Sequence, residues 1–395
     1  MTISIANLNA ILQNDYLPGF KSQLNEELSY FYKLMEKNTS PSMGANETFL
    51  VTFGRSGGIG SRTELGTLPD AAAANRLQIS VVPKNLYARI SLSDRLIKSS
   101  ATGASFVNAL DLEMKEMFRD AKDNLNRQMF GDGTGTLALC AAAVAAGQTV
   151  IAVDNTRYFA EGMVIDTIDM TVPAAPAAGN TRRTITAIDE ANSTITVTPA
   201  LTKATAANDA ICISGSYGLE ITGLDAIMTP NNTIYGVIRA NNTWFNPGAI
   251  DATRVALDDE IMEQAIQRVD LKSGKKPEVI LAGYRAYRVL KNYLAQFQRY
   301  SEIETRYDAG HVTMSYNGIP VEQDKYQGDT TMDFLNIADT FELLSIGELF
   351  DWMDMDGAIL KPVANTAAYE AILTNYAEIM CKQPGANTRI TNITQ

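Results

Sequence analysis

The chain has 395 residues, of which 46% are hydrophobic, and a formal net charge of -12 at pH 7. This length exceeds one ordinary hydrophobic core and predicts two or three domains or lobes. The acidic balance argues against nucleic-acid binding as the main task, because phosphate neutralisation needs surplus Lys and Arg. No apolar run is long enough to span a bilayer, and the N-terminus lacks the basic start and cleavage site of a signal peptide, so we expect no membrane insertion and no export.

The N-terminal part predicts a helix followed by a hairpin. After the Pro18-Gly19 break, residues 20–37 repeat apolar side chains at helical spacing and predict an amphipathic arm, with Leu24, Leu28, Phe31, Tyr32 and Met35 on one side. Residues 47–55 then alternate in strand fashion, with Phe49, Val51 and Phe53 on one face. Residues 76–93 form a long second strand region in which Leu77, Ile79 and Val81 alternate likewise, so a hairpin with a long tip is expected.

The tip of this hairpin, "FGRSGGIGSRTELGTLPD" at residues 53–70, is rich in glycine. A phosphate-binding loop would require a lysine, and none lies between Lys37 and Lys84. A dinucleotide fingerprint would require a glycine where Thr63 stands. The segment is therefore not a phosphate cradle.

The same tip contains few large apolar residues. Between Arg55 and Arg76 they are Ile59, Leu65 and Leu68, too few for a core of their own. Because an isolated two-stranded ribbon is marginal in water, we expect this one to reach beyond its own subunit and contact another.

Residues 105–131 give the strongest helical pattern, with Ser105 as a cap and Gly131 as a stop. The pattern places an apolar stripe on one face of the helix: Phe106, Leu110, Met114, Met117, Phe118, Ala121, Leu125 and Met129.

Short strands separated by turns follow, at residues 148–153, 162–168, 183–189, 193–199 and 210–215, and predict a small inserted β domain. The rest mixes helices at 252–272 and 284–298 with strands at 278–283, around 311–324 and at 369–380.

The residues with chemical potential form no recognisable site. His311, the only histidine, lies at the start of a strand and is more consistent with a solvated or hydrogen-bonded side chain than with a general base. Asp351, Asp354 and Asp356 fit a charged turn better than an EF-hand, because Val363 stands where the bidentate glutamate belongs. The three cysteines, Cys140, Cys212 and Cys381, match neither a disulfide framework nor a zinc motif and indicate a reducing compartment. We therefore predict no catalytic residue, no metal and no cofactor.

Five ordered segments carry a resemblance to a known family: "FGRSGGIGSRTELGTLP", "NLYARISLSDRLI", "LNRQMFGDGTG", "YNGIPVEQDKY" with "MDFLNIADTFELLS", and "AYEAILTNYAEIMCKQPGANTRI". In this order and spacing they resemble the tailed-phage major capsid proteins with the Hong Kong 97-type fold. The resemblance implies an α+β fold with an N-terminal arm, an extended β-hairpin loop, a peripheral domain with a long spine helix, and an axial domain, here with an inserted small all-β domain.

The resemblance also implies a division of the chain. The arm would be residues 1–45, the extended loop 46–95, and the spine helix with its surroundings 96–137. The inserted domain would be residues 138–216, the axial domain 217–345, and the return to the peripheral domain 346–395. In this arrangement the loop lies over a neighbouring subunit, and its glycines give the backbone freedom that varied shell curvature needs. The residues expected to contact that neighbour are Arg55, Gly57, Gly58, Gly60, Arg62 and Glu64.

The implied function is structural and not enzymatic. Many copies would form the hexamers and pentamers of an icosahedral or prolate shell in the host bacterial cytoplasm and enclose double-stranded DNA without sequence-specific binding or contact with a membrane. A separate scaffolding protein, a portal and a decoration protein are the other implied partners. Covalent crosslinking is not expected, because residues 54–76 contain no lysine. The alternatives are an encapsulin-type cellular compartment and, from another class, a metal-assisted enzyme that uses Asp354, Asp356 and His311.

Overall fold

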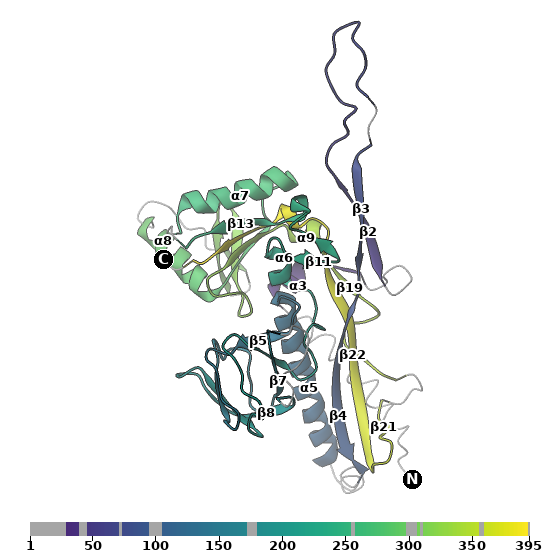
Figure 1. Cartoon of the computed structure of the whole chain (residues 1–395), viewed down its shortest axis with the longest axis vertical. Helices are drawn as coiled ribbons and strands as arrows, with labels where there is room; N and C mark the ends of the chain where they lie inside the picture. The colour runs from purple at the N-terminus through teal and green to yellow at the C-terminus, as the bar shows by residue number, and fades with distance from the viewer. Residues whose placement is uncertain are drawn as a thin grey trace. The chain divides into compact units, whose positions relative to one another are not determined.

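The computed structural model describes residues 29–38, 46–70, 73–94, 105–171, 180–253, 257–297, 306–308, 311–354 and 359–393, with the backbone alone at 105–113, 296–297, 306–308 and 311–313. The chain divides into two compact units (Figure 1). The first combines Met1–Phe130 with Asp225–Gln395, and the second is Gly131–Leu224. The predicted mixed α+β fold is confirmed.

Strand β22 (Ala368–Cys381) organises the six-stranded sheet of the first unit. It pairs along its length with β4 (Lys84–Ser93), from Ala368 opposite Ser93 to Ala377 opposite Lys84 (Figure 1). Successive parts of β22 pair with β21 (Lys361–Pro362), β20 (Asp351–Trp352) and β19 (Phe341–Ser345). The short β1 (Glu36–Asn38) runs parallel to β19 and completes the sheet.

The helix predicted at 20–37 is not continuous, because Ser29 and Met35 are non-helical and bound a short helix between them. Helix α3 (Tyr30–Leu34) begins after Ser29, whose hydroxyl accepts a hydrogen bond from the Tyr32 N–H. The prediction is wrong for Glu36 and Lys37, because their backbone groups pair with β19 instead of continuing the helix. Residues 20–28, with Leu24 and Leu28, lie outside the described residues.

The long helix predicted at 105–131 is confirmed as α5 (Ser105–Phe130), which lies against β4. Met114, Phe118, Ala121, Leu125 and Met129 of the predicted stripe are buried, and Met117 is half-buried. The side chains of Ser105, Phe106 and Leu110 lie outside those described. The regular repeat of three and four therefore located both the helix and its packing face.

A seven-stranded sheet forms the other half of the first unit. Its order is β13 (Gly248–Asp251), β23 (Thr388–Thr391), β18 (Met332–Leu335), β14 (Val279–Ala282), β17 (Ile319–Gln323), β16 (His311–Tyr316) and β15 (Arg306–Asp308). Helices α7 (Asp259–Ser273) and α8 (Tyr284–Phe297) share one apolar core with Ile280 and Ala282, so both cover the same face of the sheet. The other short elements are α6 (Leu224–Met228), β11 (Thr233–Ile234), β12 (Val237–Ile238) and η1 (Thr243–Phe245), which precede β13, and α9 (Ile337–Thr340) and η2 (Pro384–Ala386), which connect the two sheets.

The predicted elements of this region are confirmed, with two differences: the start of one helix and the sheet that the closing segment joins. The helix expected from residue 252 begins at Asp259, because residues 248–251 form β13 and the Ala252 N–H donates to the Thr391 carbonyl (2.9 Å). Asp258 caps α7 through the Ile261 N–H (2.9 Å), and Gly274 ends it at a φ of 70°. The closing segment does not return wholly to the six-stranded sheet, since β23 pairs with β13 and β18 of the other sheet.

The second unit is a sheet in the order β5 (Thr136–Leu139), β10 (Ala210–Ile213), β7 (Val164–Ile168), β8 (Arg183–Asp189), β9 (Thr194–Thr198) and β6 (Val150–Ala152). A bridge between Cys140 and Val153 links the end of β5 to the end of β6 and closes the sheet into a barrel. The interior is apolar, with Ile151, Ile165, Ile185, Ile195 and Ile211 buried. The strands expected from the sequence are all present, whereas β5 was not predicted.

The chain enters and leaves this barrel at neighbouring points. The Gly218 N–H donates to the Thr134 carbonyl at 2.7 Å, so the two crossing segments lie side by side. A left-handed Gly133, with a φ of 80°, lies next to Thr222 of the leaving segment. We call these two paired segments, around Thr134 and Gly218, the stalk of the barrel.

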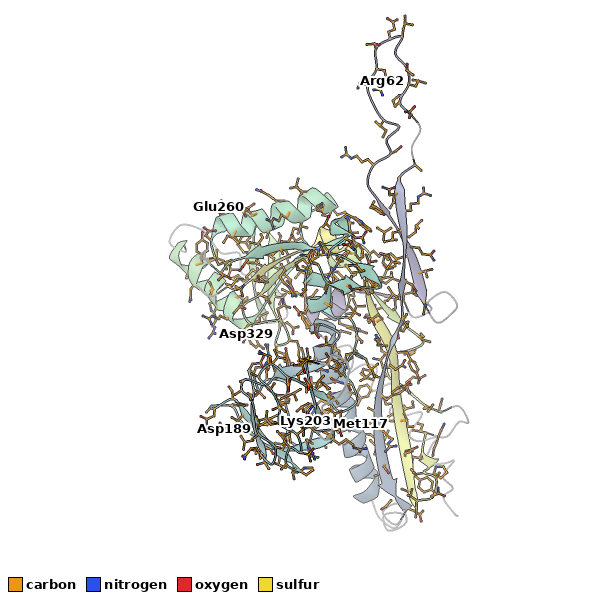
Figure 2. The ribbon with its side chains drawn as sticks, in the orientation of Figure 1. Arg62, Met117, Asp189, Lys203, Glu260 and Asp329 are labelled. Atoms are coloured by element: carbon orange, nitrogen blue, oxygen red, sulfur yellow. The ribbon has the colours of Figure 1, made fainter. Side chains whose placement is uncertain are left out.

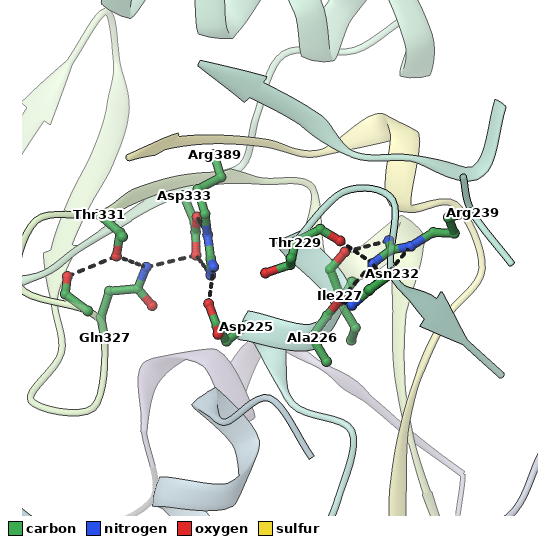
Figure 3. A network of polar contacts seen from close by, with 11 residues as sticks. Asp225, Ala226, Ile227, Thr229, Asn232, Arg239, Gln327, Thr331, Asp333 and Arg389 are labelled. Atoms are coloured by element: carbon green, nitrogen blue, oxygen red, sulfur yellow. Dashed lines mark hydrogen bonds and ion pairs between the residues drawn. The ribbon is translucent and has the colours of Figure 1, made fainter. Parts of the chain in front are cut away.

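A buried ion pair joins β23 to β18 in the seven-stranded sheet (Figure 3). Arg389 meets the fully buried Asp333 through two parallel bonds, Nε to Oδ1 at 2.6 Å and Nη2 to Oδ2 at 2.8 Å. Burial acts against the charge of Arg389, but the Asp333 carboxylate outweighs it and raises the pKa of the guanidinium. Gln327 donates to Asp333 (2.7 Å), and Asp225 forms a second, half-exposed ion pair with Arg389.

We expect Asp333→Ala to destabilise the chain strongly, because it leaves the Arg389 charge buried without its bidentate partner. The cost should be about 3–5 kcal/mol in the free energy of unfolding. Asp225→Ala is the matched control, since it removes the partly solvated partner of the same arginine and should cost about 1 kcal/mol or less. Urea unfolding followed by tryptophan fluorescence measures both, and equal losses in the two variants would contradict this assignment.

Candidate intersubunit surface

The extended hairpin consists of β2 (Glu47–Phe53) and β3 (Asn75–Val81), paired in full register from Glu47 opposite Val81 to Phe53 opposite Asn75. The predicted alternation is confirmed in both strands. The second strand region, however, is two strands and not one. Pro83, which lacks an N–H, follows β3, and β4 then pairs with β22 rather than with β2. The hairpin proper therefore ends at Val81.

The root of the hairpin is fixed to the body of its own subunit. Phe49 and Val81 pack with Leu344 and Met380 of the six-stranded sheet. At the far end of β2, the Phe53 ring stacks on Trp244 with their centroids 4.3 Å apart and their planes nearly parallel. An aromatic pair of this kind contributes about 0.5–1.5 kcal/mol beyond its buried area. The hairpin is thus anchored up to Phe53.

Beyond Phe53 the chain continues as a long loop past the ends of both strands, with Arg62 near its end (Figures 1 and 2). Three large apolar side chains of this loop are almost wholly solvent-exposed in the single chain: Ile59 at 83%, Leu65 at 99% and Leu68 at 81%. Burying such a side chain fully is worth about 1.5–3 kcal/mol. The loop therefore carries apolar surface that the described part of its own subunit leaves exposed.

Internal hydrogen bonds shape the end of the loop. The Gly66 N–H donates to the Thr63 carbonyl at 2.9 Å and closes a turn over residues 63–66. Arg62, just before the turn, donates through Nε to the Thr67 carbonyl at 3.0 Å and through Nη1 to the Ser61 carbonyl at 3.1 Å. The arginine thus bridges the two limbs of the loop.

The glycines of the loop have different structural roles. Gly54, with a φ of 76°, is in the left-handed region, where the chain leaves β2. A Cβ on Gly66 would lie 2.8 Å from the Thr63 hydroxyl oxygen, and one on Gly60 would lie 3.1 Å from Arg62 Nη1. These two glycines make room for the turn and for the arginine. Gly57 and Gly58 are not in the left-handed region.

The charged residues named from the sequence all lie in this loop. Arg55, Arg62 and Glu64 are exposed, as are Gly57 and Gly60, whereas Gly58 is half-buried and donates its N–H to the Ser56 hydroxyl (3.3 Å). An exposed ion pair is typically worth about 0–1 kcal/mol, less than the burial of one leucine. The sequence pattern did not reveal the brace by Arg62, although a glycine three residues after Thr63 is a recognised turn signal.

The other candidate residues do not form a site among the described residues. The backbone of His311 begins β16, but its side chain, like Asp356, lies outside the description. Within the described ranges, no three His, Cys, Asp or Glu side chains gather as metal ligands. The described helices include none that is both long and apolar enough to cross a membrane.

The three cysteines are free and buried. Burial raises the pKa of the Cys140 thiol to about 11 and those of Cys212 and Cys381 to about 12. A thiol is a nucleophile or metal ligand as the thiolate, which these environments disfavour. Their structure is that of ordinary buried side chains.

Comparison with known proteins gives the fold. No protein-family model and no curated protein matches the sequence. Among solved structures, a chain of the cyanophage A-1(L) capsid asymmetric unit is 13% identical, with a TM-score of 0.56 over 92% of this chain and 91% of that one. The chain therefore has the fold of that capsid chain, in agreement with the resemblance seen in the sequence.

Two further structures are similar at lower TM-scores. The capsid of a native GTA particle is 9% identical, with a TM-score of 0.48 over 92% of this chain and 90% of that one. The SrpI encapsulin complex from Synechococcus elongatus is 9% identical, with a TM-score of 0.46 over 94% and 90% of the two chains. Both TM-scores are below 0.5, and no inference rests on them.

We expect the loop to contribute little to the stability of its own subunit, because its large apolar side chains are exposed there. Replacing residues 57–73 by a short glycine-serine turn should change the free energy of unfolding by less than about 0.5 kcal/mol, as for ordinary surface changes. Phe53→Ala, which removes the stack on Trp244, is the contrasting variant and should cost about 1 kcal/mol or more. Thermal and urea unfolding of the unassembled chain measure both. If shortening the loop lowered the free energy of unfolding as much as Phe53→Ala does, the expectation would be wrong.

Proposed function

We propose that this chain is the major capsid protein of a tailed phage, and that many copies assemble into an icosahedral or prolate head shell around double-stranded DNA. The observation that carries the proposal is the fold, which matches that of a cyanophage capsid chain over 92% of the residues. The exposed apolar loop supports it, because a protein that works alone has no evident use for such a projection. The proposed role is structural, without a catalytic site.

We also propose the finer assignment to the Hong Kong 97 type. In this assignment β2 and β3 form the extended loop, and α5 is the spine helix. The peripheral domain contains the six-stranded sheet, and the axial domain contains the seven-stranded sheet with α7 and α8. The second unit is an insertion, supported by its closed barrel and by the bond between Thr134 and Gly218 at its stalk.

The partners follow from this role. The chain contacts copies of itself in hexamers and pentamers, with the loop residues Arg55, Gly57, Gly58, Gly60, Arg62 and Glu64 at the subunit contact. A scaffolding protein, a portal and a decoration protein assist assembly in the host bacterial cytoplasm, and the chain becomes a virion component. A net charge of -12 suits a shell that holds DNA without binding it tightly.

The purified chain, expressed with its scaffolding protein, should form closed shells that electron microscopy resolves. The physical reason is that the loop buries its apolar surface only against another copy. The variant in which residues 57–73 are shortened should remain folded and unassembled. A wild-type chain that stays a monodisperse monomer under all assembly conditions would refute the proposal, and closed particles that form without any scaffolding protein around a cargo enzyme would favour the encapsulin-type alternative.

The insertion can be tested by excision. Because Thr134 and Gly218 are hydrogen-bonded neighbours, removing residues 134–218 and joining the ends with two glycines should leave the first unit folded. Circular dichroism should retain the signal of α5, α7 and α8, and the two tryptophans, both outside the barrel, should keep their native fluorescence. Global unfolding of this variant would show that the barrel is integral to the fold.

A further inference from the structure

Helix α8 has an outer face that carries positive charge without acidic residues between the cations. Its inner side packs into the core of the seven-stranded sheet through Ala286, Leu290 and Leu294, which follow one another at intervals of four residues. The side chains on the opposite side are exposed: Tyr284, Arg285, Arg288, Lys291, Asn292 and Ala295. The sequence has no Asp or Glu between Glu278 and Glu302. This outer face, which we call the α8 strip, is therefore positive on a chain whose net charge is -12.

Arg288 and Lys291 carry the uncompensated charge of the α8 strip. Neither has a hydrogen-bond or ion-pair partner among the described residues. At the start of the helix an acidic residue is nearby, since the Asp329 carbonyl accepts a hydrogen bond from the Ala286 N–H (2.9 Å). The two cations farther along the helix are therefore the ones that can attract an anion most effectively.

The lysines at the end of α7 have a different environment. Three exposed lysines lie close together there: Lys272, Lys275 and Lys276. Asp270 and Glu278 flank them in the sequence, and Lys275 forms an ion pair with Asp339. Acidic residues thus balance the α7 lysines, which makes them a matched control for the α8 strip.

The side chains of the α8 strip fit a phosphate backbone better than a protein surface. Arg, Lys, Asn and Tyr are among the residues that donate hydrogen bonds to nucleic-acid phosphates, and the strip contains all four types. Protein interfaces are instead built around apolar and aromatic anchors and are depleted in lysine. Tyr284, at one end of the strip, is 44% exposed, and from Arg285 to Ala295 the strip has no large apolar side chain.

The spacing of the cations also suits a phosphate backbone. An α-helix rises about 1.5 Å per residue, so Arg288 and Lys291 are separated by about 4.5 Å along the axis of α8. Phosphates of one DNA strand follow one another at about 3.4 Å along the duplex. Because Arg and Lys side chains are long and flexible, the two cations can reach neighbouring phosphates of one strand.

We infer that Arg288 and Lys291, assisted by Arg285 and Asn292, bind the phosphate backbone of double-stranded DNA. The inference rests on the proposed function and names the surface through which the subunit contacts the enclosed DNA. Phosphate contacts carry no sequence information, so the binding is non-specific. The acidic remainder of the chain keeps the contact of one copy weak, and many copies in one shell add their contacts together.

Binding of a fluorescein-labelled DNA duplex of mixed sequence to the unassembled full chain tests the inference. Fluorescence anisotropy should show an affinity that falls steeply between about 50 and 200 mM salt. Arg288→Gln combined with Lys291→Gln should weaken binding about tenfold or more at the lower salt concentration. The slope of log K against log salt should become less negative by about 1.8, because each lost phosphate contact removes about 0.9.

The matched control is Lys272→Gln combined with Lys276→Gln, which removes the same charge from the balanced lysines of α7. This variant should bind DNA within about twofold of the wild-type chain. Equal losses in the two double variants would overturn the inference, since binding would then depend on the net charge of the chain and not on the α8 strip. Thermal unfolding of both variants checks that the exposed substitutions leave the fold intact.

Two further measurements distinguish charge from shape and DNA from an acidic protein. Arg288→Lys keeps the charge and should bind within about twofold of the wild-type chain, because a phosphate backbone requires charge and not base recognition. A polyglutamate peptide should compete poorly, since its binding does not release the condensed counterions of a DNA duplex. A peptide that displaces the DNA at an equal concentration of charges would overturn the choice of nucleic acid as the partner.

The outcomes separate this inference from the proposed function. A wild-type chain that forms shells but does not bind the duplex at low salt would end the inference and leave the shell role intact. A chain that binds DNA through Arg288 and Lys291 but never forms shells would end the proposed function and leave the phosphate site intact. Shells from the wild-type chain, together with loss of DNA binding in the α8 double variant alone, would support both.

Discussion

The long strand β22 is the constraint on which the rest of the first unit depends. It alone joins β4, β21, β20 and β19 into one sheet, and Tyr235 adds a hydrogen bond from its hydroxyl to the Ile379 carbonyl (2.7 Å). Because only two residues separate β3 from β4, the ladder along β22 also fixes the root of the hairpin. One strand therefore holds the sheet together and fixes the root of the hairpin.

The surroundings of the hairpin side chains change at Phe53. Below it, side chains pack on the subunit and on Trp244; beyond it, the loop depends on its own hydrogen bonds and exposes its apolar side chains. Such a division suits a protein that must fold as a single chain first and associate afterwards. We expect the folded subunit not to need the loop, which leaves the apolar surface of the loop available for association.

The seven-stranded sheet and the barrel are completed by different kinds of contact. The sheet includes β23, which is far from β13 and β18 in the sequence, and the Arg389 and Asp333 pair fixes β23 to β18. The barrel closes on itself through Cys140 and Val153 and joins the rest through a hydrogen-bonded stalk. This difference is why the second unit can be regarded as separate from the first.

The sequence by itself determined the elements whose pattern is local. The 26-residue α5, the alternation in β2 and β3 and five strands of the barrel follow from spacings within each segment, and the lack of a core in the loop follows from composition. Tertiary structure alone decided that Glu36 to Asn38 form a strand, that β4 leaves the hairpin for β22, and that β23 joins the other sheet. It also decided which loop residues face outward as apolar surface and that Arg62 braces the loop. The reason is physical: these outcomes depend on backbone partners and ring contacts from segments far away in the chain, and no local periodicity encodes them.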